Sequence, residues 1–374
     1  MNIQRHLKNL HQSGMYRELK SIESVFGKFI FIDGQRYINF TSNDYLGLGQ
    51  LAFNVEDFEQ FMKKYSLNLS SSRLVSGNSI IYDHLETEIS SWLHFENCLI
   101  SNSGYDANLT IFNTLKDENV LIFSDEKNHA SIIDGIKLNG LKKLIYNHLD
   151  YDHLESMLGM YAAKDVQKII VSDSVFSTNG HIIDMDRLVA LKNKYDATLL
   201  IDASHSLGLN IFKDYQDVDV LTASLSKAWG AHGGVILCNS DVKELMVNQG
   251  RPVIYSSSLP IYNLFFIKKG LHYLSNNYER QANIAYLSNY FNECFKKLLP
   301  NQLYSVSPIK YITFDHLDVA EEIYHKLLDN NIFLSYLRYP TVQKPTLRIS
   351  LSYFHDEEDV DKLFTLINQY YRGE

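Results

Sequence analysis

The stretch SLSKAWGAHGG, residues 224–234, contains a single lysine, Lys227, and lies between two apolar runs. The run before it is DVDVLTA, the run after it is VILC, and no other charged residue lies within several positions of the lysine. Short apolar runs of this kind are typical of buried strands. The sequence therefore predicts a lysine carried by a loop between two buried strands.

Further apolar runs of the same kind occur between residues 98 and 240. They read VLIFSD, KLIYN, KIIVSDS, TLLIDAS, VLTASLS and GVILC, and helical stretches such as DRLVALKNKYD separate several of them. Apolar strands that alternate with helices indicate a parallel sheet covered on both faces. We therefore expect an α/β protein whose large domain spans residues 41–262.

The two ends of the chain have different patterns. Residues 1–40 predict an arm with a short amphipathic helix and a hairpin that turns at Asp33-Gly34. Residues 263–374 predict a connector helix and a smaller α+β domain, because VAEEIYHKLLDNN, IFLSYL, TLRISLS and EEDVDKLFTLINQYY read as helix, strand, strand and helix.

Composition limits the classes of partner. The 374 residues are 45% apolar, and 35 basic against 44 acidic residues give a net charge of −9, which argues against nucleic acid and anionic membrane surfaces as partners. We see no apolar run long enough to span a bilayer and no secretory signal. The cysteines lack metal-binding spacing, so we expect no metal site and reduced thiols in the cytoplasm. They are Cys98, Cys238 and Cys294.

Polar residues stand where three of the apolar runs end. KIIVSDSVFSTNG ends in Ser174, Ser177 and Thr178. TLLID ends in Asp202 with His205 three positions later, and VLTASLSK ends in Ser224 and Lys227. The carboxyl ends of parallel strands share one edge of a sheet, so these side chains are expected to meet in one cleft. A lysine there can form an imine with a carbonyl, and an aspartate can pair with a pyridinium nitrogen. Together they predict a pyridoxal phosphate site.

A phosphate needs backbone N–H groups at the start of a helix, and SNSGYDANLTIF supplies a small-residue turn, Ser103-Gly104, before an apolar helix. Each candidate residue alone has a plainer explanation. Asp202 can cap a helix, His205 can be a buried core histidine, and Lys227 can extend to water. Their shared position at strand ends is what favours the cofactor site.

With these residues identified, the chain resembles the α-oxoamine synthases, fold-type I pyridoxal phosphate enzymes that condense an amino acid with an acyl thioester. The likeness extends over nearly the whole chain. It rests on SNDYLGLG (42–49), SRLVSGNSIIYDHLE (72–86), SDEKNHASIIDG (124–135), DSVFSTNGHIIDM (173–185), IDASHSLG (201–208) and TASLSKAWG (222–230). The resemblance implies a mostly parallel seven-stranded sheet between helices, a smaller α+β C-terminal domain and a homodimer.

The resemblance also implies roles for individual residues. Lys227 would carry the cofactor imine, Asp202 would pair with the pyridine nitrogen, His129 would stack on the ring, and His205 would contact the phenolic oxygen. Other implied cofactor contacts are Gly104, Tyr105, Ser177 and Ser224, with Ser257 and Ser258 reaching the neighbouring subunit's phosphate. Implied substrate contacts are Arg17, Asn43, His129, Thr341 and Arg348, the last of these to the amino-acid carboxylate.

Within the family, GMYREL, VIYSSSLP and RYPTVQKPTLRISLSYFH resemble the 8-amino-7-oxononanoate synthases of biotin biosynthesis. That branch would take L-alanine and a pimeloyl thioester of acyl carrier protein or coenzyme A. DASHSLG and TASLSK are nearer to relatives that make α-aminoketone signalling molecules, and a glycine C-acetyltransferase is a further alternative. A non-catalytic partner subunit on the same fold is the most remote reading, because such partners typically lose the imine lysine.

Overall fold

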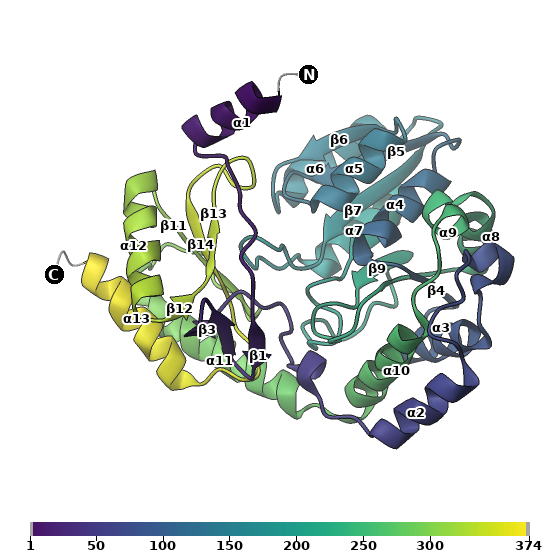
Figure 1. Ribbon diagram of the computed structural model, residues 1–374. Helices are drawn as coiled ribbons and strands as arrows, with labels where there is room; N and C mark the ends of the chain where they lie inside the picture. Colours follow the sequence, from purple (N-terminus) through teal and green to yellow (C-terminus); the bar gives the residue numbers. More distant parts are fainter. Residues whose placement is uncertain (1–2, 372–374) are drawn as a thin grey trace. The chain divides into compact units, whose positions relative to one another are not determined.

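The computed structural model describes residues 3–371, which form two compact units (Figure 1). Unit 1 consists of the described parts of Met1–Tyr45 and Asn283–Glu374 together with Thr178–Gly180. Unit 2 consists of Leu46–Ser177 and His181–Ala282. The domain limits expected near residues 40 and 262 stay a prediction, because contacts within one chain do not establish independent domains.

Unit 2 is built on a seven-stranded sheet, as predicted. The strand order is β4 (Asn97–Ser101), β10 (Gly234–Cys238), β9 (Val220–Ser224), β8 (Ala197–Asp202), β7 (Gln167–Asp173), β5 (Val120–Asp125) and β6 (Lys142–Tyr146). Strands β9, β8, β7, β5 and β6 pair in parallel. Strand β10 alone runs antiparallel to both of its neighbours. The α/β fold class is therefore confirmed.

Helices cover this sheet and close its core. They are α2 (Val55–Lys64), α3 (Ile80–Leu93), α4 (Gly104–Thr114), α5 (Ala130–Leu138), α6 (Tyr151–Met160), α7 (Met185–Tyr195), α8 (Ser240–Gln249), α9 (Arg251–Tyr255) and α10 (Ile261–Asn276), with short helical turns at Leu48–Gln50 and Arg73–Gly77. Helix α4 packs against α5, β9 and β10. Its Ile111 and Phe112 are buried with Ile122 of β5 and Leu200 of β8. This apolar contact holds α4 against the sheet.

Unit 1 contains two small sheets. The first has the order β1 (Ser24–Phe26), β2 (Phe29–Ile32), β3 (Gln35–Asn39) and β12 (Ile332–Phe333). The second has the order β11 (Ile309–Thr313), β14 (Thr346–Ser350) and β13 (Ser335–Leu337). The predicted hairpin joins β2 to β3, and Asp33 and Gly34 both have the positive φ that a tight two-residue turn requires.

The remaining helices of the described chain are α1 (Ile3–Gln12), α11 (Glu279–Lys296), α12 (Leu317–Asp329) and α13 (Glu357–Tyr371). Helix α11 begins in unit 2 and continues into unit 1. In the core of unit 1, Phe291 and Phe295 of α11 pack with Leu347 of β14 and Leu363 of α13. The predicted order of helix, strand, strand and helix at the end of the chain is confirmed, although IFLSYL divides into strands of two different sheets.

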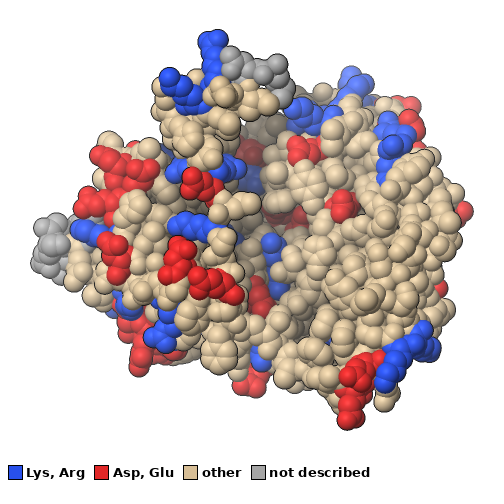
Figure 2. All heavy atoms as spheres, viewed as in Figure 1, with Lys and Arg blue, Asp and Glu red and all other residues tan. Residues whose placement is uncertain are grey.

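Charged side chains are distributed unevenly over unit 2. On the face drawn in Figure 2, the surface around α9 and α10 carries few acidic or basic side chains. Within residues 3–371, no helix combines the length and the apolar character that a bilayer span requires.

Candidate active site

A cavity of about 220 Å³ lies in unit 2 where strands β7, β8 and β9 end and helices α4 and α5 begin. Seven residues predicted from the sequence line it, namely Gly104, Tyr105, His129, Asp202, His205, Ser224 and Lys227. Five further residues complete the lining, namely Ser103, Ser131, Asp173, Val175 and Ser204. The structure thus brings the predicted lysine, aspartate and two histidines into one cavity.

Strand register explains why Asp202 reaches this cavity. It is the last residue of β8 and is paired across the sheet with Asp173 of β7 and Thr222 of β9. The residue is only 5% exposed, and its Oδ1 accepts a hydrogen bond of 2.9 Å from the backbone N–H of Ser204. The carboxylate is therefore held at a strand end with its orientation set by the backbone.

The loop that carries Lys227 is anchored by its neighbours in the sequence. Trp229 is almost fully buried, and its Nε1 donates a hydrogen bond of 2.9 Å to the carbonyl oxygen of Ile267 in α10. Gly230 has φ of +68° and lies so close to Leu48 and Gly49 that a Cβ atom would overlap their backbone. Local packing thus holds the loop that presents the lysine to the cavity.

Gly104 shapes the wall next to the first turn of α4. A Cβ atom built on it would lie 2.7 Å from the Cβ atom of Ser224, which is closer than real Cβ contacts allow. Ser103 caps the helix by accepting a 3.0 Å hydrogen bond from the backbone N–H of Asp106. The N-terminus of α4 can therefore approach the end of β9 closely, as a phosphate site at a helix start requires.

We expect Gly104→Ala to weaken pyridoxal phosphate binding strongly. The added methyl group must displace either Ser224 or the first turn of α4, and overpacking of this kind typically costs about 1–3 kcal/mol. The affinity for the cofactor can be measured from its visible absorption. Gly159→Ala in α6 is the matched control, because its Cβ atom would meet only the Tyr195 hydroxyl at 3.8 Å. Equal affinity in the two variants would contradict the phosphate assignment.

Asp173 is a second carboxyl group in the same cavity. It is 3% exposed, and its Oδ1 has no hydrogen-bond partner among the described residues. Burial, followed by the neighbouring charge of Asp202, raises the pKa of Asp173 well above its ordinary value. Asp173 therefore favours the neutral form more than an exposed aspartate does.

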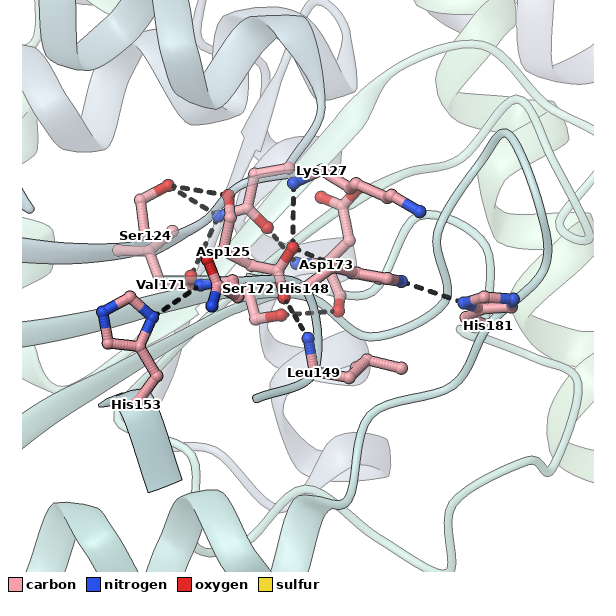
Figure 3. A network of polar contacts seen from close by, with 12 residues as sticks. Ser124, Asp125, Lys127, His148, Leu149, His153, Val171, Ser172, Asp173 and His181 are labelled. Atoms are coloured by element: carbon pink, nitrogen blue, oxygen red, sulfur yellow. Dashed lines mark hydrogen bonds and ion pairs between the residues drawn. The ribbon is translucent and has the colours of Figure 1, made fainter. Parts of the chain in front are cut away.

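A buried polar network supports the strand that bears Asp173 (Figure 3). The Nδ1 of His148 lies 3.0 Å from Oδ1 of Asp125, and its Nε2 lies 2.9 Å from Nδ1 of His181. Burial and the neighbouring His148 lower the pKa of His181 to about 4. The Oδ1 of Asn128 accepts a 2.9 Å hydrogen bond from the backbone N–H of Asp173. The ends of β5 and β7 are therefore tied together behind the cavity.

The remaining predicted residues lie outside the lining of this cavity. In unit 2, Ser177 lies beyond the end of β7, and Ser257 forms an isolated bridge with Ser72. Ser258 is buried at 7% exposure, and its backbone N–H donates to the carbonyl oxygen of Ser71. The roles predicted for the three serines, Ser177, Ser257 and Ser258, stay predictions.

The four predicted substrate residues outside the cavity form two pairs within unit 1. The Nη2 of Arg348 donates to Oδ1 of Asn43 at 2.9 Å, and Arg348 itself is only 7% exposed. The Nη2 of Arg17 donates to Oγ1 of Thr341 at 3.0 Å. Each arginine thus lies beside another residue for which the family resemblance implies a substrate contact.

No role in the site was predicted for the cavity residues Ser131, Asp173 and Val175. Asp173 ends the apolar run KIIVSD just as Asp202 ends TLLID, so the same signal could have identified it. Ser131 stands two positions after His129, where helix α5 begins, and carries no such signal. Among the described residues, no cluster of three or more histidine, cysteine or acidic side chains has the arrangement of a metal site.

Comparison with known proteins identifies the family of this chain. A family model described as aminotransferase class I and II matches residues 35–367. A relative from Thermodesulfovibrio yellowstonii is 34% identical over 97% of this chain and 96% of its own length. Another from Glaesserella parasuis is 35% identical over 97% of this chain and 98% of its own length. Both carry the provisional name 8-amino-7-oxononanoate synthase.

Solved structures share the fold. A serine palmitoyltransferase from S. paucimobilis with bound PLP and myriocin has a TM-score of 0.90 at 21% identity, over 100% of this chain and 97% of the other. At that identity the match establishes the fold alone. An 8-amino-7-oxononanoate synthase from Francisella tularensis has a TM-score of 0.78 at 27% identity, over 90% of this chain and 98% of the other.

Proposed function

Because this chain belongs to the α-oxoamine synthase family of pyridoxal phosphate-dependent enzymes, we propose that it condenses L-alanine with a pimeloyl thioester. The products would be 8-amino-7-oxononanoate, carbon dioxide and the free carrier thiol, in biotin biosynthesis. The carrier would be acyl carrier protein or coenzyme A. The relatives at 34% and 35% identity support this choice of substrates over others in the family.

The observation that carries the proposal is the meeting of Lys227, Asp202, His129 and Gly104 in one cavity. An amine, a carboxylate, an imidazole and a glycine-lined helix start are the groups that pyridoxal phosphate requires. When bound, this cofactor supplies an electron sink for a carbanion next to the amino nitrogen. The cavity residues present in this chain therefore fit the cofactor.

Each of these side chains has a proposed task. The ε-amine of Lys227 would hold the aldehyde carbon of the cofactor in the resting enzyme, and once the amino group of alanine had displaced it, the freed amine would be able to accept the α-proton of alanine. Asp202 would hold the proton on the ring nitrogen. His129 would cover one ring face and present a polar ring atom to the substrate, while His205 would contact the phenolic oxygen. With its ring covered by these side chains, the bound cofactor would have water excluded from its reacting carbon.

Substrate recognition is proposed for the two pairs of unit 1. A guanidinium group binds a carboxylate through two parallel hydrogen bonds, so Arg348 suits the carboxylate of alanine. Its hydrogen-bond partners include the neutral side chains of Asn43 and Ser350. Arg17 and Thr341 are also proposed to contact substrate.

The substrate assignment predicts a specific product. With L-alanine and pimeloyl thioester, the purified enzyme is expected to release 8-amino-7-oxononanoate, identified by its mass. Glycine, serine and thioesters of shorter and longer chains serve as matched competitors in the same assay. Preference for another pair of substrates would overturn the assignment to biotin biosynthesis while leaving the α-oxoamine synthase chemistry in place.

A second candidate in the same family is favoured by one feature. DASHSLG, around Asp202 and His205, resembles relatives that make α-aminoketone signalling molecules. Such an enzyme would use a different amino acid or a different acyl chain. A glycine C-acetyltransferase would use glycine and an acetyl group instead. The same panel of substrates separates these possibilities.

We also predict a homodimer with shared sites. Next to the bridge between Ser72 and Ser257, the side chains of Leu74, Val75 and Tyr255 are 56%, 81% and 71% exposed. Exposed apolar groups that cluster in this way are typical of an interface. In sedimentation, we expect a dimer that the cofactor stabilises. A fully active monomer would contradict the model, and so would unchanged cofactor affinity after Ser256, Ser257 and Ser258 are replaced by alanine.

The proposed reaction belongs in the cytoplasm. All three cysteines of the chain are free, and two of them, Cys98 and Cys238, are buried. Burial raises the pKa of both thiols, which disfavours the reactive thiolate. Unreactive, reduced cysteines are typical of a reducing compartment.

A further inference from the structure

Asn108, which lies in the second turn of α4, is at the centre of a buried hydrogen-bond junction. Its Oδ1 accepts a 2.7 Å hydrogen bond from the hydroxyl of Thr222 on β9. Its Nδ2 donates to Oδ2 of Asp202 at 2.7 Å and to the hydroxyl oxygen of Ser131 at 2.8 Å. Asn108, Ser131 and Thr222 have no exposed surface. All polar atoms of this amide are therefore used.

The orientation of the amide follows from these partners. A carboxylate accepts hydrogen bonds and cannot donate them, so the NH₂ group of Asn108 must face Asp202. In the opposite orientation the amide oxygen would face the carboxylate, and two acceptor oxygens cannot form a hydrogen bond with each other. Thr222 then has one acceptor available, the amide oxygen, and its hydroxyl donates to it. The donor and the acceptor of each hydrogen bond in the junction are thus assigned in only one way.

The same assignment of donors and acceptors extends through Ser131 to His129. The hydroxyl oxygen of Ser131 accepts from Asn108 and lies 2.7 Å from Nδ1 of His129. The backbone N–H of Ser131 donates to the same Nδ1 at 3.3 Å, as the cap of helix α5. An N–H group cannot donate to a protonated nitrogen, so Nδ1 is the acceptor and the hydroxyl proton also points to it. In the neutral ring the proton is then on Nε2.

We propose that Asn108 is a positioning residue that fixes both Asp202 and, through Ser131, the tautomer of His129. The inference rests on the proposed function, which puts Asp202 at the ring nitrogen and His129 over the ring face. One amide then controls two groups that act on the same cofactor. His129 presents Nε2–H, a hydrogen-bond donor, so it is suited to a carboxylate or carbonyl oxygen of the substrate. A histidine with the other tautomer would present an acceptor and repel such an oxygen.

The first test uses the protein without cofactor, so that its outcome does not depend on turnover. Two-bond ¹H–¹⁵N spectra of histidine-labelled protein distinguish the tautomers, and loss of one set of signals in His129→Gln assigns His129. The wild-type protein is expected to show the Nε2–H tautomer at neutral pH. Ser131→Ala removes the 2.7 Å hydroxyl contact and leaves only the longer 3.3 Å backbone N–H contact at Nδ1, so it is expected to shift His129 part of the way toward the other tautomer. An Nδ1–H tautomer in the wild type, or an unchanged spectrum in Ser131→Ala, would overturn the proposal.

The second test concerns the link to Asp202. Asn108→Ala is expected to move the pH dependence of the visible absorption of bound pyridoxal phosphate and to lower kcat more than it changes KM. Asn113→Ala, on the same helix, is the matched control, because Asn113 is also buried but pairs with Asn139 and the backbone of Arg251. Identical titrations of the two variants would refute the role of Asn108.

A third variant covers the case in which Asn108→Ala does not fold. Thr222→Val keeps the shape of the side chain and removes only the hydroxyl that orients the amide. It is expected to shift the same titration in the same direction by a smaller amount, and no shift would count against the junction. A protein that passes these tests but fails to make 8-amino-7-oxononanoate would refute the proposed substrates and leave the positioning role intact.

Discussion

Replacing Lys227 by alanine is expected to slow product formation by about a thousandfold or more while the fold stays intact. The lysine is proposed to supply both the covalent attachment of the cofactor and the base that removes the α-proton, so both functions are lost together. Its loop is held by Trp229 and Gly230, which the substitution leaves in place. The rate of product formation and the absorption of the bound cofactor provide the measurement.

Two further variants make this test specific. Lys227→Arg keeps the positive charge but cannot form the covalent link, so it is expected to be as inactive as alanine. Lys192→Ala removes a lysine that pairs with Asp219, which lies outside the cavity lining, and is expected to retain activity. If Lys227→Ala kept more than a few per cent of the wild-type rate, the assignment of this lysine would be wrong.

Asp202→Asn is expected to retain the cofactor and to lose activity by about 10²–10³-fold, the scale seen when one preorganised electrostatic contact is removed. An amide has nearly the same shape as the carboxylate but carries no negative charge. It therefore cannot favour the protonated ring nitrogen, and the electron sink becomes weaker. Exchange of the α-proton of alanine, followed by NMR in deuterated water, measures the affected step directly.

Asp219→Asn is the control for this experiment. The Oδ2 of Asp219 accepts a 2.7 Å hydrogen bond from the backbone of Leu199, and its Oδ1 pairs with Lys192. The change removes a carboxylate near the same strands without touching the cavity. Normal α-proton exchange in Asp202→Asn would show that another group holds the ring proton.

Much of this site could be predicted because its main residues follow apolar runs. TLLID and VLTAS are buried strands that end at Asp202 and Ser224, and the loop with Lys227 follows directly. In a parallel sheet such ends share one edge, so adjacency in space follows from a pattern along the chain. The apolar runs predicted six strands of the large sheet, and the seven-stranded sheet was implied by the family resemblance. Its strand β4, NCLIS, was not among the predicted runs.

The tertiary structure alone decided which polar residues support those groups. Asn108 meets Asp202 across 94 positions of sequence, and Arg348 meets Asn43 across 305. A polar residue inside a helix has no periodic signal that identifies its partner. Its contact depends on how α4 packs on β9, and that depends on the burial of apolar side chains such as Ile111 and Phe112. The sequence by itself therefore determined which reactive side chains stand at the strand ends. The packing of segments far apart in the sequence determined the hydrogen bonds that orient those side chains.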